Sequence, residues 1–388
     1  MYNIKMLNKI SPAGTNVFDK AKYSVTLECD SPDAIMVRSA AMHDMEFDSN
    51  LKAIARAGAG VNNIPIDKCS EKGIVVFNTP GANANAVKEL AICALLLASR
   101  KIVAGANWAQ SLKGNVEDVA KAVEKGKSEF VGPELAGKTL GVIGLGAIGA
   151  QLANTAIHLG MNVLGYDPYI TVDAAWSLSK TVKHEKDLDK IFAESDYISI
   201  HVPSTPETKC MINTGSIAKM KSGARIINLA RADLVKAADI KTAIAEGKIA
   251  SYVTDFPTEE ILGVDGIVAI PHLGASTPES EDNCAYMAAA ELIDFLENGN
   301  IKNSVNYPNV SIPRTSDTRV CIFHKNVPEM LAKISTVFAN DKFNIENLFN
   351  GSKKDNAYTL VEVNGKVSDS TVEKIKGIDG VVRVTVID

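Results

Sequence analysis

The chain has 388 residues, a length that exceeds one ordinary domain and predicts two or three separate cores. Hydrophobic residues make up 46% of it and charged residues 22%, which is typical of a globular α/β protein and excludes a disordered or fibrous one. The net charge of −5, with the lysines scattered along the chain, argues against a nucleic-acid partner.

The cysteines and the apolar segments give no sign of a metal site or a membrane. The six cysteines are far apart and lack paired CxxC spacing, so we expect reduced thiols. The first residues, MYNIKMLNKI, lack the apolar run and cleavage site of a secretory signal. The most apolar segment, residues 91–99, falls short of the ~20 residues that span a bilayer. We therefore expect a cytoplasmic protein without membrane contact.

Two series of strands and helices are predicted in chain order. Residues 5–80 alternate apolar runs with helical patterns, which favours parallel strands buried on both faces. Residues 87–103 predict one long, largely buried helix linking two lobes. After a polar stretch, GKTLGVIGLGAIG opens a second series, and apolar runs continue it to residue 272. This second series predicts a whole dinucleotide-binding sheet.

The last third predicts a helix, a linker and a small domain. The helical segment ESEDNCAYMAAAELIDFLENG ends at Gly299, where glycine is an expected helix stop. Residues 303–313, rich in Asn and Pro, predict a linker, and residues 317–388 a separate βαββαβ unit. We expect this unit to be separable from catalysis and to self-associate through an apolar TRVCIF edge.

The segment KTLGVIGLGAIG contains the strongest motif of the chain. Gly144, Gly146 and Gly149 have GxGxxG spacing after a strand and before a helix, whose amino-terminal amides bind a pyrophosphate. Asp167 ends the next apolar run, where a carboxylate can accept hydrogen bonds from the adenine ribose. No cation follows it in Pro168–Ile170 to offset a 2′-phosphate, so NAD is favoured over NADP.

A hydride-transfer enzyme also needs a group that handles the hydroxyl proton, and histidine is suited to it. His272 follows the strand GIVAIP, at the carboxyl edge where open α/β sheets bind ligands. Arg231, after the strand of INLA, predicts a two-bond clamp on a carboxylate, with a structural ion pair as the alternative. Glu260 follows another strand and could hydrogen-bond His272 and raise its pKa. The other histidines fit surface, cofactor-contact or C-terminal positions better.

The blocks GLGAIG, HVPSTPET, INLARADLV, TDFPTEE and PHLGAST resemble signatures of the D-isomer-specific 2-hydroxyacid dehydrogenases. The resemblance implies an α/β protein with an active site in the cleft between two domains. The NAD-binding domain, Rossmann-type and doubly wound, would cover residues 86–277. A split flavodoxin-like substrate-binding domain would cover residues 1–85 and 278–312, and a small ACT-like domain residues 317–388.

The same resemblance assigns the site residues. Arg231, Glu260 and His272 would be catalytic, although the chain reads VTDFPTEE where the family usually has LDVF, which leaves Glu259 as an alternative to Glu260. The cofactor contacts implied by the motif and the resemblance are Gly144, Gly146, Ala147, Ile148, Gly149, Asp167, His201, Pro203, Thr208 and Asp255. The substrate contacts implied by VRS and ARAGAGVNNIP are Arg38, Ser39, Gly60, Val61 and Asn62.

The C-terminal segments HKNVPEMLAKI and FNIENLF resemble an ACT domain, a regulatory fold that binds serine in many relatives. His324, Asn326 and Asn344 lie where that family places its ligand contacts. Glu329 replaces the usual glycine, and its side chain would crowd an amino acid. Two outcomes are therefore open: L-serine acts as effector, or the tail serves only assembly.

The expected reaction is oxidation of D-3-phosphoglycerate to 3-phosphohydroxypyruvate, the first step of serine biosynthesis, with hydride transfer to NAD. Arg38 would supply a cation for the phosphate, with Lys127 as a further candidate. The alternatives are a hydroxypyruvate or glyoxylate reductase, and a non-catalytic NAD-sensing protein. A homodimer or homotetramer is expected, with small molecules as the other partners.

Overall fold

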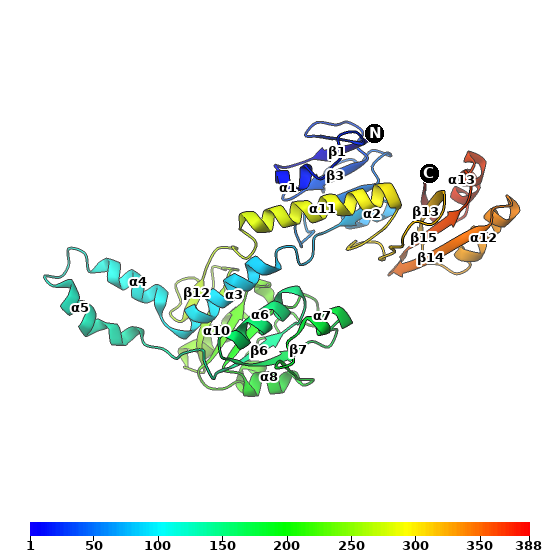
Figure 1. Cartoon of the computed structure of the whole chain (residues 1–388). Helices are drawn as coiled ribbons and strands as arrows, with labels where there is room; N and C mark the ends of the chain where they lie inside the picture. Colours follow the sequence, from blue (N-terminus) through cyan, green and yellow to red (C-terminus); the bar gives the residue numbers. More distant parts are fainter. The chain divides into compact units, whose positions relative to one another are not determined.

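The computed structural model describes residues 1–388, which divide into two compact units. One unit comprises Met1–Asn83 together with Pro278–Asp388, and the other comprises Ala84–Thr277. Figure 1 labels the helices and strands of both units. None of the helices is both long enough and apolar enough to cross a lipid bilayer.

The unit Ala84–Thr277 is built on a seven-stranded sheet in which every strand pairing is parallel, in the order β12-β11-β10-β9-β6-β7-β8. The strands are β6 (Thr139–Ile143), β7 (Asn162–Tyr166), β8 (Lys183–His184), β9 (Tyr197–Ile200), β10 (Ala224–Asn228), β11 (Ile249–Thr254) and β12 (Ile267–Ala269). Since β9 returns to the other side of β6, the strand order reverses there, as in doubly wound folds. The predicted Rossmann-type sheet is confirmed.

Helices cover both faces of this sheet. The helices of the unit are α3 (Ala84–Ser99), α4 (Ile102–Ser111), α5 (Val119–Gly126), α6 (Ala147–His158), α7 (Val172–Ser177), α8 (Leu188–Glu194), α9 (Thr214–Lys219) and α10 (Ala237–Ala245), with 3₁₀ turns Lys127–Phe130 and Ala232–Leu234. One apolar core contains α3 and α6, and a second contains α8, α9 and α10. The helix predicted over residues 87–103 ends earlier, at Ser99, and α4 begins at Ile102.

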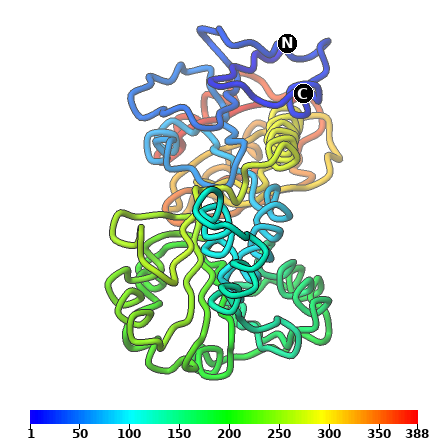
Figure 2. Tube along the Cα trace, turned by 90° about the vertical axis from the view of Figure 1, so that its left-hand side faces the viewer, coloured from blue at the N-terminus to red at the C-terminus, as the bar shows by residue number.

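The other unit begins with a five-stranded parallel sheet in the flavodoxin-like order β2-β1-β3-β4-β5. Its elements are β1 (Tyr2–Met6), α1 (Pro12–Thr15), β2 (Tyr23–Thr26), β3 (Ala34–Val37), β4 (Ala53–Arg56), α2 (Ile66–Glu71), β5 (Val75–Phe77) and the returning helix α11 (Pro278–Asn298). In Figure 2 α11, in yellow, lies against this blue part of the chain, and it contacts α1, β3 and β4. Gly299 ends α11 with a φ of +69°, as predicted.

Residues 318–387 form a four-stranded antiparallel sheet in the order β14-β15-β13-β16 with two helices. The elements are β13 (Thr318–Lys325), α12 (Met330–Asn340), β14 (Ile345–Lys353), β15 (Asn356–Val363), α13 (Asp369–Lys376) and β16 (Val381–Ile387). The predicted βαββαβ order is confirmed. The prediction that TRVCIF forms an edge is wrong, because β13 is paired on both sides and the edges are β14 and β16.

The two faces of the antiparallel sheet belong to different cores. On β13, Val320 and Ile322 pack with α12 and α13, whereas Cys321 and Phe323 belong to the core that contains Phe295 of α11. Tyr307, in the segment predicted to be a linker, is buried in that same core. Residues 303–313 are therefore a packed connection, and the shared core argues against simple removal of the tail.

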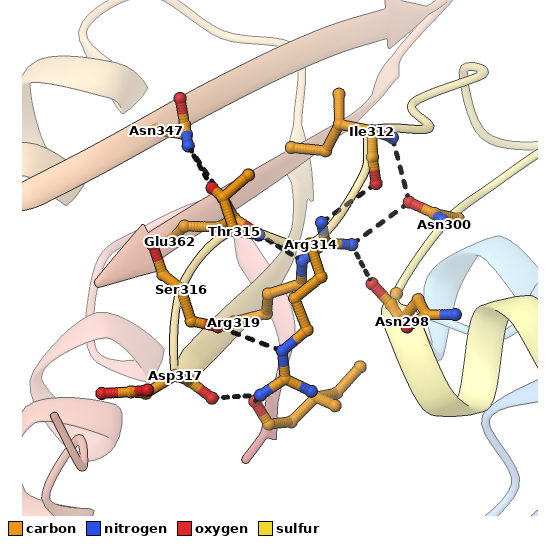
Figure 3. Close-up of polar contacts among 12 residues, drawn as sticks. Asn298, Asn300, Ile312, Arg314, Thr315, Ser316, Asp317, Arg319, Asn347 and Glu362 are labelled. Atoms are coloured by element: carbon orange, nitrogen blue, oxygen red, sulfur yellow. Dashed lines mark hydrogen bonds and ion pairs between the residues drawn. The ribbon is translucent and has the colours of Figure 1, made fainter. Parts of the chain in front are cut away.

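A buried ion pair also holds the antiparallel sheet to the end of α11 (Figure 3). Arg319 Nε lies 2.7 Å from Glu362 Oε1, and both side chains are fully buried. The same guanidinium donates to the main-chain oxygens of Asn298 at 2.6 Å and Ile312 at 3.0 Å. Burial alone would raise the pKa of Glu362, but hydrogen bonds from Thr315, Arg319 and Asn347 lower the pKa to about 2. The pair is thus charged and fully partnered.

Candidate functional site

The glycine-rich turn joins β6 to α6 at the point where the strand order reverses. Gly144 has a φ of +91°, and a Cβ on it would lie 2.6 Å from His201 O. A Cβ on Gly149 would lie 1.9 Å from Gly144 O, so helix and turn could not pack as they do. Around Gly146 there is open space within 4 Å, and Gly146 caps α6 without a side-chain hydrogen bond. The amides at Ala147 and Ile148 thus open the helix as donors for a pyrophosphate.

Asp167 lies just beyond β7, beside this turn. Its Oδ2 accepts a hydrogen bond from Leu145 N and its Oδ1 one from Tyr169 N, each at 2.9 Å. A carboxylate has about four acceptor positions, so capacity is left for the ribose hydroxyls of a dinucleotide. No ion pair joins Asp167 to a lysine or arginine that could offset a 2′-phosphate. The residues therefore fit NAD.

The segment after β9 adds a neutral imidazole and a tight turn. His201 Nε2 lies 2.8 Å from Ser199 Oγ, and burial lowers the pKa of His201 to about 4, so the ring is uncharged at neutral pH. Thr208 Oγ1 donates to Pro203 O at 2.6 Å, which closes the loop between them. His201 is thus suited to hydrogen bonding and not to pairing with a phosphate charge.

Arg231 and His272 each lie against the ring of Phe256 at the carboxyl edge of the sheet. The Phe256 and His272 ring centroids are 4.6 Å apart, and Arg231 Cζ lies 5.9 Å from the Phe256 centroid. Arg231 and His272 are both exposed, and Arg231 Nη1 donates to Ala230 O at 2.7 Å. The guanidinium and the imidazole therefore share one accessible edge, as predicted from the strand ends.

Asp255 is a buried carboxyl beside this pair, and its side chain is 1% exposed. Its Oδ2 accepts from Gly274 N at 3.2 Å, and its Oδ1 is buried without a partner. Burial raises the pKa of Asp255, and the charges of His272 and Arg231 offset only part of that rise. Sequence reasoning assigned Asp255 to the cofactor and missed Phe256, although TDF directly follows a buried strand and could have indicated both.

Glu260 and Glu259 lie in an exposed turn after β11. Neither forms a hydrogen bond or an ion pair with His272 in the structure. Glu260, but not Glu259, lines a hollow of about 240 Å³ together with Phe256 and Tyr252. Since catalytic hydrogen bonds often close only when substrate is bound, the Glu260–His272 contact stays a prediction.

Arg38 and Ser39 follow β3, the central strand of the five-stranded sheet, at the carboxyl ends of its strands. Asn8 Oδ1 accepts from the amides of Arg38 and Ser39 at 3.1 and 3.0 Å, and from Ala40 N at 2.9 Å. Arg38 Nη2 pairs with Glu281 Oε1 of α11 at 2.7 Å. Arg56 Nε donates to Arg38 O at 3.1 Å, which brings a second guanidinium to this edge. The sequence analysis missed Arg56. Arg56 is the last residue of the buried strand β4, much as Arg38 directly follows the buried strand β3, and this position could have indicated it.

The predicted substrate residues Gly60, Val61 and Asn62 lie in the loop after β4. Gly60 and Val61 are half-buried and Asn62 is exposed. Asn62 O lies 3.0 Å from His43 Nε2, and Ala59 O accepts from Asn78 Nδ2 at 2.6 Å. The loop is therefore held from both ends by side chains outside it.

The predicted effector residues differ in accessibility. His324 is buried, with Nδ1 2.8 Å from Lys325 O and Nε2 2.8 Å from Thr359 Oγ1, so both ring nitrogens have partners inside the chain. Asn326 and Asn344 are exposed and bond Lys354 O and Glu346 Oε1. Glu329 has a φ of +66°, the left-handed region that favours glycine.

A doubly wound sheet with this glycine-rich turn, and with an imidazole and a guanidinium at its carboxyl edge, defines a nucleotide-binding protein of the dehydrogenase class. Residues 92–275 match the D-isomer specific 2-hydroxyacid dehydrogenase NAD-binding domain, and residues 321–383 match an AHAS small subunit-like ACT domain. The chain belongs to the D-isomer specific 2-hydroxyacid dehydrogenase family, and the resemblance seen in its sequence is confirmed.

Several curated relatives carry related names. D-3-phosphoglycerate dehydrogenase of Archaeoglobus fulgidus is 36% identical over 79% of this chain and 56% of the relative. The Haemophilus influenzae enzyme of the same name is 31% identical, and the match covers 84% of this chain and 79% of the length of that enzyme. Hydroxypyruvate reductase of Thermotoga maritima is 41% identical over 64% of this chain and 80% of its own. The chain thus spans little more than half the length of the Archaeoglobus relative.

A solved structure supports the same fold. The NAD⁺-bound 3-phosphoglycerate dehydrogenase of Entamoeba histolytica has a TM-score of 0.59 and 28% identity, and the match covers 79% of this chain and 98% of that one. With the NAD-binding domain of the family in residues 92–275, NAD is the cofactor of this chain.

Proposed function

We propose that the chain is an NAD-dependent dehydrogenase that oxidises D-3-phosphoglycerate to 3-phosphohydroxypyruvate. The observation that carries the proposal is that Arg231 and His272 both lie against Phe256, at the edge of the sheet that holds the glycine-rich turn. The Archaeoglobus and Haemophilus relatives named for this activity support the choice of substrate.

Each residue of the edge has one proposed task. His272 takes the proton of the substrate hydroxyl, and Arg231 holds the substrate carboxylate through two parallel hydrogen bonds. Phe256 fixes both side chains by packing against them. Glu260 orients His272 once substrate is present, and the buried Asp255 contributes acceptor capacity beside both. When bound, NAD accepts the hydride.

The phosphate is proposed to bind at the carboxyl edge of β3 and β4. Arg38 supplies the first cation and Arg56 the second, while Ser39 and the segment Gly60–Asn62 contact the rest of the substrate. Lys127 is a weaker candidate, because it is exposed on the surface and pairs with Glu124. An anionic substrate must exchange with the Glu281 carboxylate on Arg38.

A hydroxypyruvate reductase is the second candidate, because the Thermotoga relative with that name is 41% identical. A non-catalytic NAD-sensing protein is the third. The test is NADH production by the full chain with D-3-phosphoglycerate, D-glycerate and D-lactate. Turnover with D-3-phosphoglycerate at least tenfold above the others supports the proposal. A preference for D-glycerate supports the reductase, and no turnover at all would support the sensor.

The remaining assignments are part of the same proposal. The division into a substrate-binding domain (1–85 and 278–312), an NAD-binding domain (86–277) and an ACT-like regulatory domain (317–388) is tested by limited proteolysis of the full chain. Residues 86–277 should survive as one fragment, whereas the shared core should keep residues 278–312 and 317–388 together. Inhibition of turnover by L-serine would identify L-serine as the effector, and titration calorimetry of the full chain measures the binding of L-serine. A cytoplasmic location is tested by cell fractionation.

Self-association is proposed from the helices that extend from the seven-stranded sheet. In Figure 1, α4 and α5 point away from it, and neither helix has a buried residue. Apolar side chains on them are exposed, including Ile102, Val103 and Val119. Such surface usually marks an interface, so we expect a homodimer or homotetramer. Light scattering coupled to size-exclusion chromatography gives the oligomer mass.

A further inference from the structure

An open depression of about 620 Å³ lies between the end of the β14–β15 hairpin and residues 303–309. Its walls come from three places that are far apart in the sequence: the residue after β5, the packed connection, and the last residues of β14. The polar residues that line the depression are Asn78, Asn303, Ser304, Asn309, Ser352 and Lys353. Amides, hydroxyls and one cation thus converge on one small volume.

The cation in this depression lacks a negatively charged partner. Lys353 Nζ donates to Ser304 O at 2.7 Å, and no carboxylate forms an ion pair with it. Burial, and secondarily the charge of neighbouring Lys354, lower the pKa of Lys353. A partly desolvated ammonium held by one neutral oxygen favours the arrival of an anion, because the anion restores the electrostatic stabilisation that water supplied.

The walls of the depression are held in place without a ligand. Gly351 lies so close to the connection that a Cβ on it would be 2.9 Å from Pro308 Cβ. Arg319, paired with Glu362, donates to Ile312 O in the same connection and to Asn298 O at the end of α11, which fixes the antiparallel sheet to both (Figure 3). Binding would therefore need little ordering of the chain, which favours affinity for a small molecule.

We propose that this depression binds a small carboxylic acid of the α-amino or α-hydroxy acid class. Its carboxylate would pair with Lys353. Its second polar group would bond the Ser352 hydroxyl and the carboxamide positions of Asn78 and Asn303 that their hydrogen bonds to Ala59 O and Glu291 Oε1 leave open. The site is separate from His324, Asn326 and Asn344. It suits this chain better as an effector site, because Lys353 there bonds only a neutral oxygen, whereas both ring nitrogens of His324 have partners inside the chain.

Asn78 connects this site to the loop that carries the candidate substrate residues. Its main-chain N–H donates to Asn303 O at 3.3 Å, and its side chain donates to Ala59 O at 2.6 Å. Thr79 N also donates to Gly58 O at 3.2 Å. A ligand that engages Asn78 and Asn303 acts directly on the anchor of residues 58–62. The effect on catalysis rests on the proposed function, whereas binding and loop ordering do not.

The binding test is titration calorimetry of the full chain with L-serine, glycine, D-lactate and inorganic phosphate as probes. We expect at least one of the three carboxylates to bind. Lys353→Gln should weaken that binding about tenfold or more, the loss expected for one charge-assisted hydrogen bond. Lys353→Arg should retain most of the affinity, and it shows that a change at this position leaves the chain folded.

Two control variants separate this site from its surroundings. Lys354→Gln removes the same charge from the adjacent residue, which does not line the depression, and Asn344→Ala alters the other candidate site. Both should bind as the unaltered chain does. The proposal is overturned if no carboxylate binds, if phosphate alone binds, if Lys353→Gln and Lys354→Gln weaken binding equally, or if only Asn344→Ala weakens it.

Hydrogen exchange of the full chain tests the connection to the loop. Saturation with the bound carboxylate should slow amide exchange in residues 58–62, and this slowing should be absent in Lys353→Gln. Unchanged exchange across residues 58–62 in the unaltered chain would overturn the connection while leaving the binding result intact. Because neither measurement uses turnover, failure here is distinguishable from failure of the proposed reaction.

Discussion

The guanidinium of Arg38 is paired with the carboxylate of Glu281 at 2.7 Å, so the residue proposed to receive the substrate phosphate already holds an anion. The two side chains are 44% and 43% exposed. An exposed pair of this kind contributes only about 0.2–1 kcal/mol, so a phosphate can displace Glu281.

Glu281→Gln should lower KM for D-3-phosphoglycerate about two- to fivefold, because the competing anion on Arg38 is lost while kcat depends on other residues. Steady-state kinetics with varied substrate measure the change. Glu279→Gln, in the same first turn of α11 but without an ion pair, is the matched control. An unchanged KM for Glu281→Gln would remove Arg38 from phosphate binding or show that the pair opens freely.

His272→Ala should lower kcat by ~10²–10⁴-fold, because the imidazole moves the hydroxyl proton. The dissociation constant of NAD, measured by fluorescence titration, should change little, since the imidazole acts on the proton and not on the dinucleotide. His158→Ala, on the exposed end of α6, serves as the control. A loss of less than tenfold in kcat would contradict the assigned role.

Arg231→Lys should reduce kcat/KM severely although it keeps the positive charge. An ammonium cannot make the two parallel hydrogen bonds of a planar guanidinium, and it packs less well on the Phe256 ring. Arg100→Lys, an exposed position beside α3, should leave the kinetics unchanged. If Arg231→Lys retains full kcat/KM, charge alone matters there or the carboxylate is held elsewhere.

Arg319→Met should destabilise the unit Met1–Asn83 with Pro278–Asp388 by ~3–5 kcal/mol, because Glu362 would remain buried without its cation. Urea unfolding measures the loss. The double variant with Glu362→Gln should recover part of it, since no uncompensated charge is then buried. Equal stability of the single and double variants would show that the charge of Glu362 is not the cause.

The same pair sets an acid limit on stability. The pKa of Glu362 is about 2 in the folded chain against an ordinary value of 4.5, so its stabilisation is present above pH 4.5 and is lost as pH falls through 2. Between pH 2 and 4.5 the free energy of unfolding, measured with urea, should therefore change less with pH in Glu362→Gln than in the unaltered chain.

Glu291 on α11 should make the stability of the chain fall as pH rises, the opposite of the effect of Glu362. Its Oε1 accepts from Asn303 Nδ2 at 2.7 Å, its Oε2 is buried without a partner, and burial raises the pKa of Glu291 to about 8. The stabilisation of the fold by the neutral Glu291 carboxyl group is therefore fully present below pH 4.5 and is lost as pH rises through 8. At pH 9 Glu291→Gln should be more stable than the unaltered chain, by on the order of 5 kcal/mol. Urea unfolding at pH 5 and 9 provides the comparison, and a variant less stable at pH 9 contradicts it.

The parts of this protein that depend on neighbouring residues were predictable from the sequence. Gly144, Gly146 and Gly149 act within one strand, turn and helix, and Asp167 ends the next strand, so local sequence specifies their geometry. Arg231 and His272 follow apolar runs, and parallel strands bring their carboxyl ends to one edge. Apolar runs thus indicated most strands of the two parallel sheets, but not the exposed two-residue strand β8, and not the order in which the strands pair.

Contacts between distant segments were decided only by the tertiary structure. The apolar run of β13 indicates burial, but not that both its edges are paired or that Phe323 packs against Phe295. Asn306, in the segment predicted to be a linker, accepts from Val76 N across 230 residues of sequence. The charged residues Arg319 and Glu362 can be buried because they form an ion pair with each other. Hydrophobic pattern determined which segments of this chain are buried, whereas side-chain packing and hydrogen-bond pairing between distant segments decided which partners they meet.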